Sequence, residues 1–172
     1  HIGVLGVDRY SAYNCAWRGR MQYCLEHFKR NIRDLLEAEP KSRECQRHIP
    51  RFLELLASAM TLRNRKRGKE YDEASVAIRD ELLAIARGPV RDGKLKECFD
   101  IIVNRRDRFF QWVRNPEVEA ENNLAERRLR PLVIARKACF GSQSENGLKT
   151  RETLMTVIDT LSLRCDDPVA KL

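Results

Sequence analysis

The 172-residue chain, with a mass of 20.1 kDa and 42% hydrophobic residues, has the size of one ordinary domain and enough apolar content to build a core. This composition excludes a disordered tail and a large multidomain assembly. Lysine and arginine outnumber aspartate and glutamate by 33 to 25, a net charge of +8. Such a balance is typical of proteins that bind a polyanion, although it also occurs in proteins that are merely basic.

Cysteine usage and hydropathy indicate a cytoplasmic protein. The six cysteines lie at wide spacings without a Cys-x-x-Cys pair, which is a poor match to a disulfide framework. No apolar run approaches the roughly 20 residues that cross a bilayer, so we expect no membrane contact. The chain begins at His1, directly before an apolar run typical of a fold interior, and this indicates a piece of a longer polypeptide.

The first forty residues predict two strands and two helices. Residues 2–7 form a nearly continuous apolar run that ends at Asp8, as expected for a strand buried on both faces. A short helix is expected over 10–15 and a second strand over 18–24. Over 26–38, apolar residues recur every three or four positions, which predicts an amphipathic helix.

A connector and a helix follow. Residues 41–49 are basic and are interpreted as the connector, and Pro50 then opens the helix at its favoured first-turn position. The core side of this helix is expected to carry Phe52, Leu55, Leu56, Ala59, Met60 and Leu62.

Two further helices are predicted after a basic loop over 63–69. Apolar residues repeat at helical spacing over 71–85, and Gly88-Pro89 closes that helix. The next helix is expected over 95–113, until Asn115-Pro116 ends it.

The last third of the chain predicts a short helix over 122–130, interrupted at Pro131, and an apolar segment over 132–135. A polar loop over 141–147 precedes a final amphipathic helix over 148–163. The balance is mostly helix with two short strands. Because two strands alone make a poor sheet, we expect sheet partners upstream of the chain.

Two carboxylates stand out by position. Asp8 ends the buried strand, where open α/β sheets place ligand sites, and Glu126 lies in a helix opening rich in asparagine and arginine. Carboxylates from a strand end and a helix are a common way to hold Mg²⁺. Spacing alone leaves a second interpretation open, in which Glu126 pairs with Arg130 and Asp8 caps the next turn.

Other patterns are less specific. Cys24 with His27, and Cys45 with His48, each lie three residues apart and together offer the four ligands of a zinc site, although the spacing is not that of a standard zinc finger. The chain contains no Gly-x-Ser-x-Gly elbow and no glycine-rich phosphate loop, which excludes the common hydrolases and kinases.

The segment Arg105–Arg114 interleaves aromatic and basic residues. Such a pattern fits nucleic acid, or the core face of a helix with arginines around it. Arg106 lies on the apolar stripe between Ile102 and Phe109. Its side chain is therefore the one candidate in this segment to point toward a functional site.

Three ordered blocks together resemble the catalytic region of the insertion sequence 66 family of bacterial transposases. They are Val4–Asn14 (VLGVDRYSAYN), Cys24–Arg30 (CLEHFKR) and Asn122–Lys137 (NNLAERRLRPLVIARK), the last followed by Phe140-Gly-Ser142. The blocks bracket almost the whole chain, and residues 40–115 fit only as a variable helical insertion.

The resemblance implies an α/β fold of the ribonuclease-H-like (DDE transposase) type, incomplete at its N-terminal side. In such enzymes three acids, Asp, Asp and Glu, hold two Mg²⁺ or Mn²⁺ ions for DNA strand cleavage and strand transfer. Asp8 matches the second acid and Glu126 the third. No residue of this chain matches the first acid, so we expect the chain alone to fold incompletely or to bind metal weakly, and not to transpose.

Further roles are implied by the same resemblance. Double-stranded DNA, as transposon ends and target, is the expected partner, in a bacterial, nucleoid-associated protein that is a homo-oligomer when active. His27 is a possible active-site neighbour. The expected DNA contacts are Asn122, Asn123, Arg127, Arg130, Arg136 and Lys137.

The chain departs from the family pattern at two positions. Glu121 stands where the family commonly has aspartate, which preserves the charge. Arg9 stands where the family usually has glycine after the second acid, and an arginine beside Asp8 is expected to compete with metal for the carboxylate.

The sequence therefore predicts the carboxyl-terminal part of a metal-dependent DNA transposase. Its expected divisions are a core half over 1–39, a helical insertion over 40–115 and a catalytic glutamate region over 116–172. The alternative is a non-catalytic DNA-binding or interaction module, a truncated remnant of such an enzyme.

Overall fold

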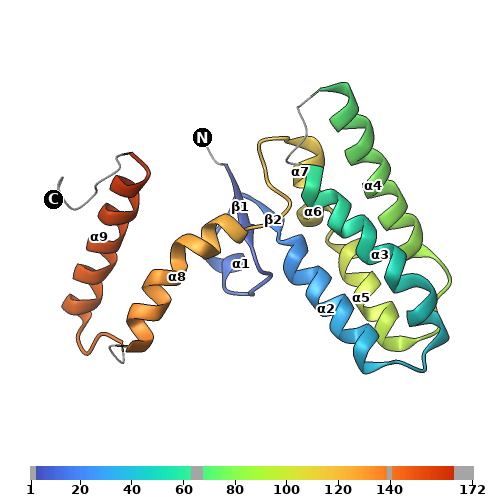
Figure 1. The fold of residues 1–172 in the computed structure, drawn as a ribbon, viewed down its shortest axis with the longest axis horizontal. Helices are drawn as coiled ribbons and strands as arrows, with labels where there is room; N and C mark the ends of the chain where they lie inside the picture. The colour runs from blue at the N-terminus through green and yellow to red at the C-terminus, as the bar shows by residue number, and fades with distance from the viewer. Residues whose placement is uncertain (1–2, 63–67, 139–140, 165–172) are drawn as a thin grey trace. The chain divides into compact units, whose positions relative to one another are not determined.

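The computed structural model describes residues 3–62, 68–138 and 141–164. The chain forms two compact units, His1–Asn122 and Asn123–Leu172. Both are dominated by helices (Figure 1). The three-part division expected from the sequence stays a prediction.

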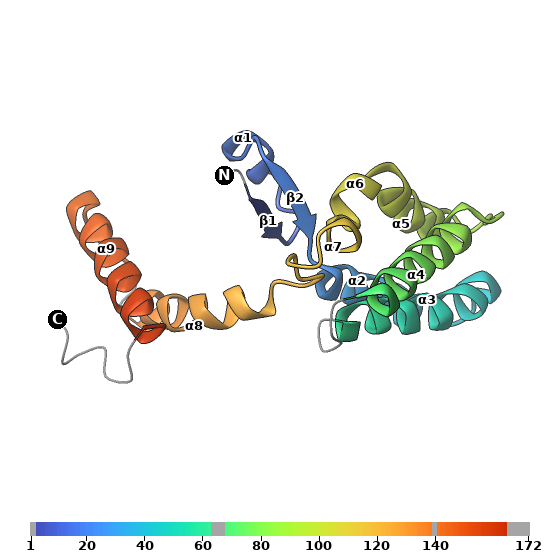
Figure 2. The same cartoon turned by 90° about the horizontal axis from the view of Figure 1, so that it is seen from above.

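The first unit begins with a two-stranded parallel sheet. Strands β1 (Val4–Val7) and β2 (Arg20–Tyr23) pair in register from Val4 opposite Arg20 to Val7 opposite Tyr23, and the crossover contains the one-turn helix α1 (Tyr13–Ala16). Both predicted strands are confirmed. Because the described residues hold only this small sheet (Figure 2), the ribonuclease-H-like core remains a prediction.

Four helices build the body of the first unit. They are α2 (Leu25–Ala38), α3 (Arg43–Thr61), α4 (Lys69–Arg87) and α5 (Gly93–Asn104), and they pack side by side (Figure 1). Each buries one apolar face, as the helical spacing predicts. The six core positions expected between residues 52 and 62 are all buried. Most of the predicted basic loop, residues 63–67, lies outside the described residues.

Aromatic rings form the centre of this core. The Phe28 ring lies 6.2 Å from Phe52 and 4.8 Å from Phe109 between centroids, and Phe52 lies 5.0 Å from Phe99. All four rings are almost fully buried. Such pairs add about 0.5–1.5 kcal/mol each beyond the burial itself, so they hold the sheet end and the helices as one body.

The predicted connector before Pro50 is wrong, because α3 begins at Arg43 and contains Pro50. The Ser42 hydroxyl caps the helix by accepting from the Cys45 amide at 3.3 Å. Extending the helix also buries Cys45 and Ile49 completely. Fully burying a side chain the size of isoleucine stabilises by about 1.5–3 kcal/mol. That burial and the cap offset a proline cost of about 3 kcal/mol.

The single helix expected over 95–113 is also wrong. Three helices replace it: α5, α6 (Arg106–Phe109) and α7 (Gln111–Arg114). The breaks fall at Arg105 (φ −115°, ψ 27°) and Phe110 (φ −125°, ψ 29°), which leave helical geometry.

A buried glutamine explains the second break. The Gln22 side-chain oxygen accepts from the backbone amides of Gln111 at 2.9 Å and Trp112 at 3.3 Å. Its amide nitrogen donates to the carbonyls of Phe109 at 3.0 Å and Tyr23 at 2.7 Å. Gln22 is only 1% exposed, so these backbone groups are satisfied by a side chain of the sheet rather than by a continuous helix.

The second unit contains α8 (Asn123–Ala138) and α9 (Glu145–Ser162). The predicted interruption at Pro131 is wrong: α8 continues through it, since its flanks are rich in leucine, alanine, arginine and glutamate, which favour helix. Helix α9 begins three residues earlier than expected because Ser144 caps it, accepting from the Gly147 amide at 3.1 Å.

Neither α8 nor α9 has a buried residue. Among the described residues, no helix of the chain is both long enough and apolar enough to cross a membrane.

Candidate metal and DNA site

The carboxyl end of the sheet gathers several of the predicted site residues. The Cys24 amide donates to the Val7 carbonyl at 2.8 Å, and the Leu25 amide donates to Ala120 at 2.9 Å. The Asn122 amide then donates to the buried Cys24 sulfur at 3.4 Å. Residues 120–122 therefore lie against the strand ends, beside the turn that carries Asp8.

Asp8 follows β1 directly and is exposed. Its Oδ1 accepts from the Tyr10 amide at 3.1 Å, which is the turn-capping contact that the sequence left open as a structural role. This bond uses Oδ1, and the second carboxylate oxygen accepts no hydrogen bond from the described residues. The carboxylate is thus oriented by its own turn and still presents an oxygen to solvent.

Arg9 packs on an aromatic ring and forms no ion pair with Asp8 among the residues that the structure describes. Its guanidinium lies over the Phe28 ring, 5.2 Å from the centroid. Burial lowers the pKa of Arg9 from its ordinary value. Its backbone φ of 77° lies in the left-handed region that favours glycine. In the described structure Arg9 and Asp8 therefore interact through their charges without an ion pair, and the competition with metal stays a prediction. The left-handed backbone gives a physical reason for the family's glycine.

Asn122 packs closely against β1. A Cβ atom built on Gly6 would lie 3.6 Å from the Asn122 Cβ, an ordinary van der Waals contact. The Asn122 side-chain oxygen is buried and accepts no hydrogen bond from the described residues. Asn122 thus belongs to the packing of the strand end, in addition to any contact with DNA.

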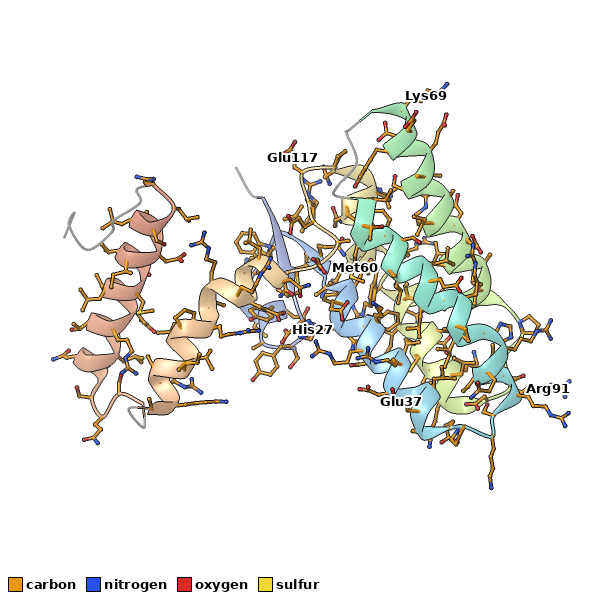
Figure 3. All side chains as sticks on the ribbon, viewed as in Figure 1. His27, Glu37, Met60, Lys69, Arg91 and Glu117 are labelled. Atoms are coloured by element: carbon orange, nitrogen blue, oxygen red, sulfur yellow. The ribbon has the colours of Figure 1, made fainter. Side chains whose placement is uncertain are left out.

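His27 lies in the first turn of α2, at the end nearest the strands, whereas Glu37 lies at the other end (Figure 3). Cys45 is at that far end, where its sulfur contacts the Asp92 carboxylate at 3.7 Å. The fourteen residues of α2 rise by about 20 Å. The Cys24/His27 and Cys45/His48 pairs therefore do not converge, and a four-ligand zinc site is wrong.

Helix α8 presents Glu126 together with polar neighbours. At 3.6 residues per turn, the spacings place five predicted residues on one side of the helix, namely Asn123, Glu126, Arg127, Arg130 and Lys137. Arg136 lies on a different side. Helical geometry thus gathers five of the six predicted residues of α8 along one stripe and separates the sixth.

The basic residues of α8 differ in their partners. Arg128, which was not among the expected DNA contacts, forms a 3.5 Å salt bridge with Asp159 and donates to Ser162 at 3.3 Å. The four expected cations of α8 are exposed and form no salt bridge in the part of the chain that the structure describes. Arg128 therefore ties α8 to α9, and the other cations remain open to a polyanion.

A family model described as "Transposase IS66 family" matches residues 1–150. The chain belongs to this family. A curated protein of Sinorhizobium fredii (strain NBRC 101917 / NGR234), "Uncharacterized protein y4qI", is 29% identical over 189 residues, covering 97% of the chain and 34% of that relative. The chain thus spans about a third of the length of the curated relative it matches. No solved structure matches the chain.

Sequence reasoning missed two features of this IS66-family site. Gln22 was not singled out, although a buried amide in a short strand signals a partner with unsatisfied backbone groups. The left-handed backbone at Arg9 was also missed, because only the family's glycine at this position points to it.

Proposed function

We propose that this IS66-family protein acts in metal-dependent DNA strand cleavage and strand transfer, with Asp8 and Glu126 as two of the metal-binding carboxylates. The alternative within the same family is a remnant that binds DNA without catalysis. The two differ in whether the carboxylates hold a divalent cation.

The observation that supports the proposal is the Asp8 carboxylate. It stands at the carboxyl end of a parallel strand, the position at which open α/β sheets place ligands. Its Asx-type turn orients the group and leaves one oxygen open. Together with membership of a transposase family, this favours a metal ligand over a purely structural cap.

The donor set fits Mg²⁺ or Mn²⁺. These cations prefer carboxylate oxygens and keep waters that substrate phosphates replace. Bound metal would polarise the scissile phosphate and activate a water or 3′ hydroxyl. The protein's part is to hold the Asp8 oxygen at a fixed strand end and to stack the Arg9 guanidinium on Phe28 without an ion pair to Asp8 in the described structure.

Helix α8 supplies the proposed DNA track. Arg127, Arg130, Arg136 and Lys137 are exposed, and phosphate contacts by such residues position a duplex without reading its sequence. Asn122 and Asn123 are proposed to add hydrogen bonds to phosphate, and His27 to neighbour the active site.

The decisive experiment is Mn²⁺ titration by calorimetry on Asp8→Asn and Glu126→Gln. Asparagine keeps the acceptor for the Tyr10 amide, so the turn should survive while the charge is lost. Each change should weaken Mn²⁺ binding by about 100-fold or more, because even indirect changes around a metal cost 10–100-fold.

Matched controls are Asp34→Asn and Glu37→Gln, which remove exposed carboxylates from α2. Both should bind Mn²⁺ as the parent does. Wild-type binding that survives in both Asp8→Asn and Glu126→Gln, or a folded wild type that binds no Mn²⁺, would contradict the metal site and favour the non-catalytic DNA-binding module.

A further inference from the structure

A cavity of about 300 Å³ lies between α4, α6 and α7 in the first unit, and neither proposed metal ligand lines it. Figure 2 shows α7 beside α4. The buried side chains of Leu83 and Phe110 form part of the wall. Four arginines also line it, namely Arg79, Arg87, Arg106 and Arg114.

The charges of this cavity do not cancel. Arg79 donates to the Asp80 carboxylate at 2.8 Å, and this bond holds the pKa of Asp80 below its ordinary value. Asp107 also lines the cavity, and its carboxylate lies 4.0 Å from Arg108, which is not one of the four lining arginines. The other three arginines form no salt bridge or side-chain hydrogen bond wherever the structure describes the chain. The cavity therefore presents an excess of open positive charge.

The broken helix explains why Arg106 faces this cavity. In a continuous helix its side chain would lie on the apolar stripe with Ile102 and Phe109, where a charge is costly. The break at Arg105 starts a new helix at Arg106, which leaves this arginine exposed while Phe109 is buried. The segment's aromatic and basic residues thus divide between core and cavity.

The backbone that carries Arg106 and Arg114 is rigidly held. Phe110 and Gln111 are buried, and the Gln111 side chain donates to the Asp107 carbonyl at 2.6 Å. Gln22 fixes the start of α7 from the sheet. Two arginines on a preorganised backbone lose less conformational entropy when a ligand binds.

We propose that this cavity binds phosphate groups of the DNA backbone. Guanidinium groups pair with phosphate oxygens in a planar, bidentate geometry, and open arginines from several helices at one concavity favour a polyanion over a neutral ligand. The α4–α7 cavity is a second DNA contact, separate from the stripe on α8. The choice of DNA as the polyanion rests on the proposed transposase function.

The test is binding of a duplex of about 30 base pairs by the double variant Arg106→Ala/Arg114→Ala, followed by fluorescence anisotropy across a salt series. Loss of two phosphate contacts should lower the slope of log K against log salt by about two. The dissociation constant at about 0.1 M salt should rise about tenfold or more. Both arginines are exposed, so circular dichroism should show an unchanged fold.

Arg91→Ala/Arg105→Ala is the matched control. It also removes two positive charges from exposed arginines, and neither of them lines this cavity. Arg105 lines a different depression, with Glu97 and Asp100. The control variant should bind DNA with nearly the parental slope. An equal loss of affinity in the two double variants would show an effect of net charge alone and overturn the assignment.

Binding of inorganic phosphate and of an acidic peptide is measured on the same variants, to distinguish these anions from DNA as the ligand of the cavity. If Arg106→Ala/Arg114→Ala binds DNA as the parent does but loses binding of phosphate or of the peptide, the cavity serves that ligand and not DNA. The proposal is independent of metal binding: intact Mn²⁺ binding with unchanged DNA affinity in the double variant refutes only this cavity. Lost DNA affinity with no Mn²⁺ site refutes only the catalytic proposal.

Discussion

The two units of the chain reach their structure in opposite ways. In residues 1–122 one continuous cluster of buried side chains joins both strands to the helices. In α8 and α9 no side chain is buried, and large apolar residues such as Leu129 and Ile134 remain more than half exposed. Packing therefore decides the geometry around Asp8, whereas helix periodicity alone orders the stripe that carries Glu126.

A pair of identical truncations tests this contrast most strongly. Leu56→Ala removes a fully buried side chain from α3 and should lower the free energy of unfolding by about 2–5 kcal/mol. Leu129→Ala removes a 56% exposed side chain from α8 and should change it by about 0.5 kcal/mol or less. Urea denaturation measures both, and equal losses would show that α8 has a packed partner.

The buried glutamine gives the next largest effect. Gln22→Ala leaves the backbone amides of Gln111 and Trp112 without their partner, while the Phe109 carbonyl keeps the bond from the Trp112 indole at 2.9 Å. We expect a loss of about 2–4 kcal/mol, since each unsatisfied buried group costs about 1–3 kcal/mol. The exposed Gln46 makes one 3.5 Å bond, so Gln46→Ala is the control. A Gln22→Ala protein as stable as the control would contradict this role.

The helix caps of the two units can be compared in the same way, and the cap of α5 makes the stability of the first unit depend on pH. Asp92 caps α5 by accepting from the Leu95 amide at 3.1 Å, and the Ser42 hydroxyl donates to it at 2.6 Å. These bonds, the Ser42 bond first, lower the pKa of Asp92. Its contribution is thus complete above the unfolded pKa of about 4 and is lost as pH falls through the lower folded value.

Asp92→Ala should accordingly cost about 1–2 kcal/mol near neutral pH and less in acid. Asp92→Asn keeps a capping oxygen and should flatten the acid dependence in urea titrations at several pH values. Ser144→Ala, the equivalent change at α9, should lower helicity without moving the unfolding transition of the first unit. An acid dependence unchanged in Asp92→Asn would refute the assignment to this carboxylate.

The smallest expected change in stability comes from the left-handed backbone conformation at Arg9. Both Arg9→Gly and Arg9→Ala remove the guanidinium from Phe28, and only glycine accepts a φ of 77° without strain. Arg9→Gly should therefore be more stable than Arg9→Ala by about 1 kcal/mol in thermal or urea unfolding. Equal stability of the two variants would mean that the turn relaxes when arginine is removed.

Much of the fold follows from local patterns. The strands beside Asp8 and the helices with clear apolar stripes are predicted because burial must alternate with a fixed period along each element. The predictions fail at Pro50 and Pro131, where a local cost of about 3 kcal/mol is smaller than the gain from the surrounding helix. They fail again at Phe110, where a side chain distant in sequence supplies the hydrogen bonds of the helix.

For the site, the sequence by itself determined membership of the IS66 transposase family and singled out the candidate residues, which are two carboxylates and a basic stripe. Only the tertiary structure decided which groups meet. It separated the two Cys/His pairs along α2, moved Arg9 onto Phe28 and opened an arginine-lined cavity at a broken helix. Such outcomes depend on contacts between residues far apart in the chain, and these form only when the shared core is packed.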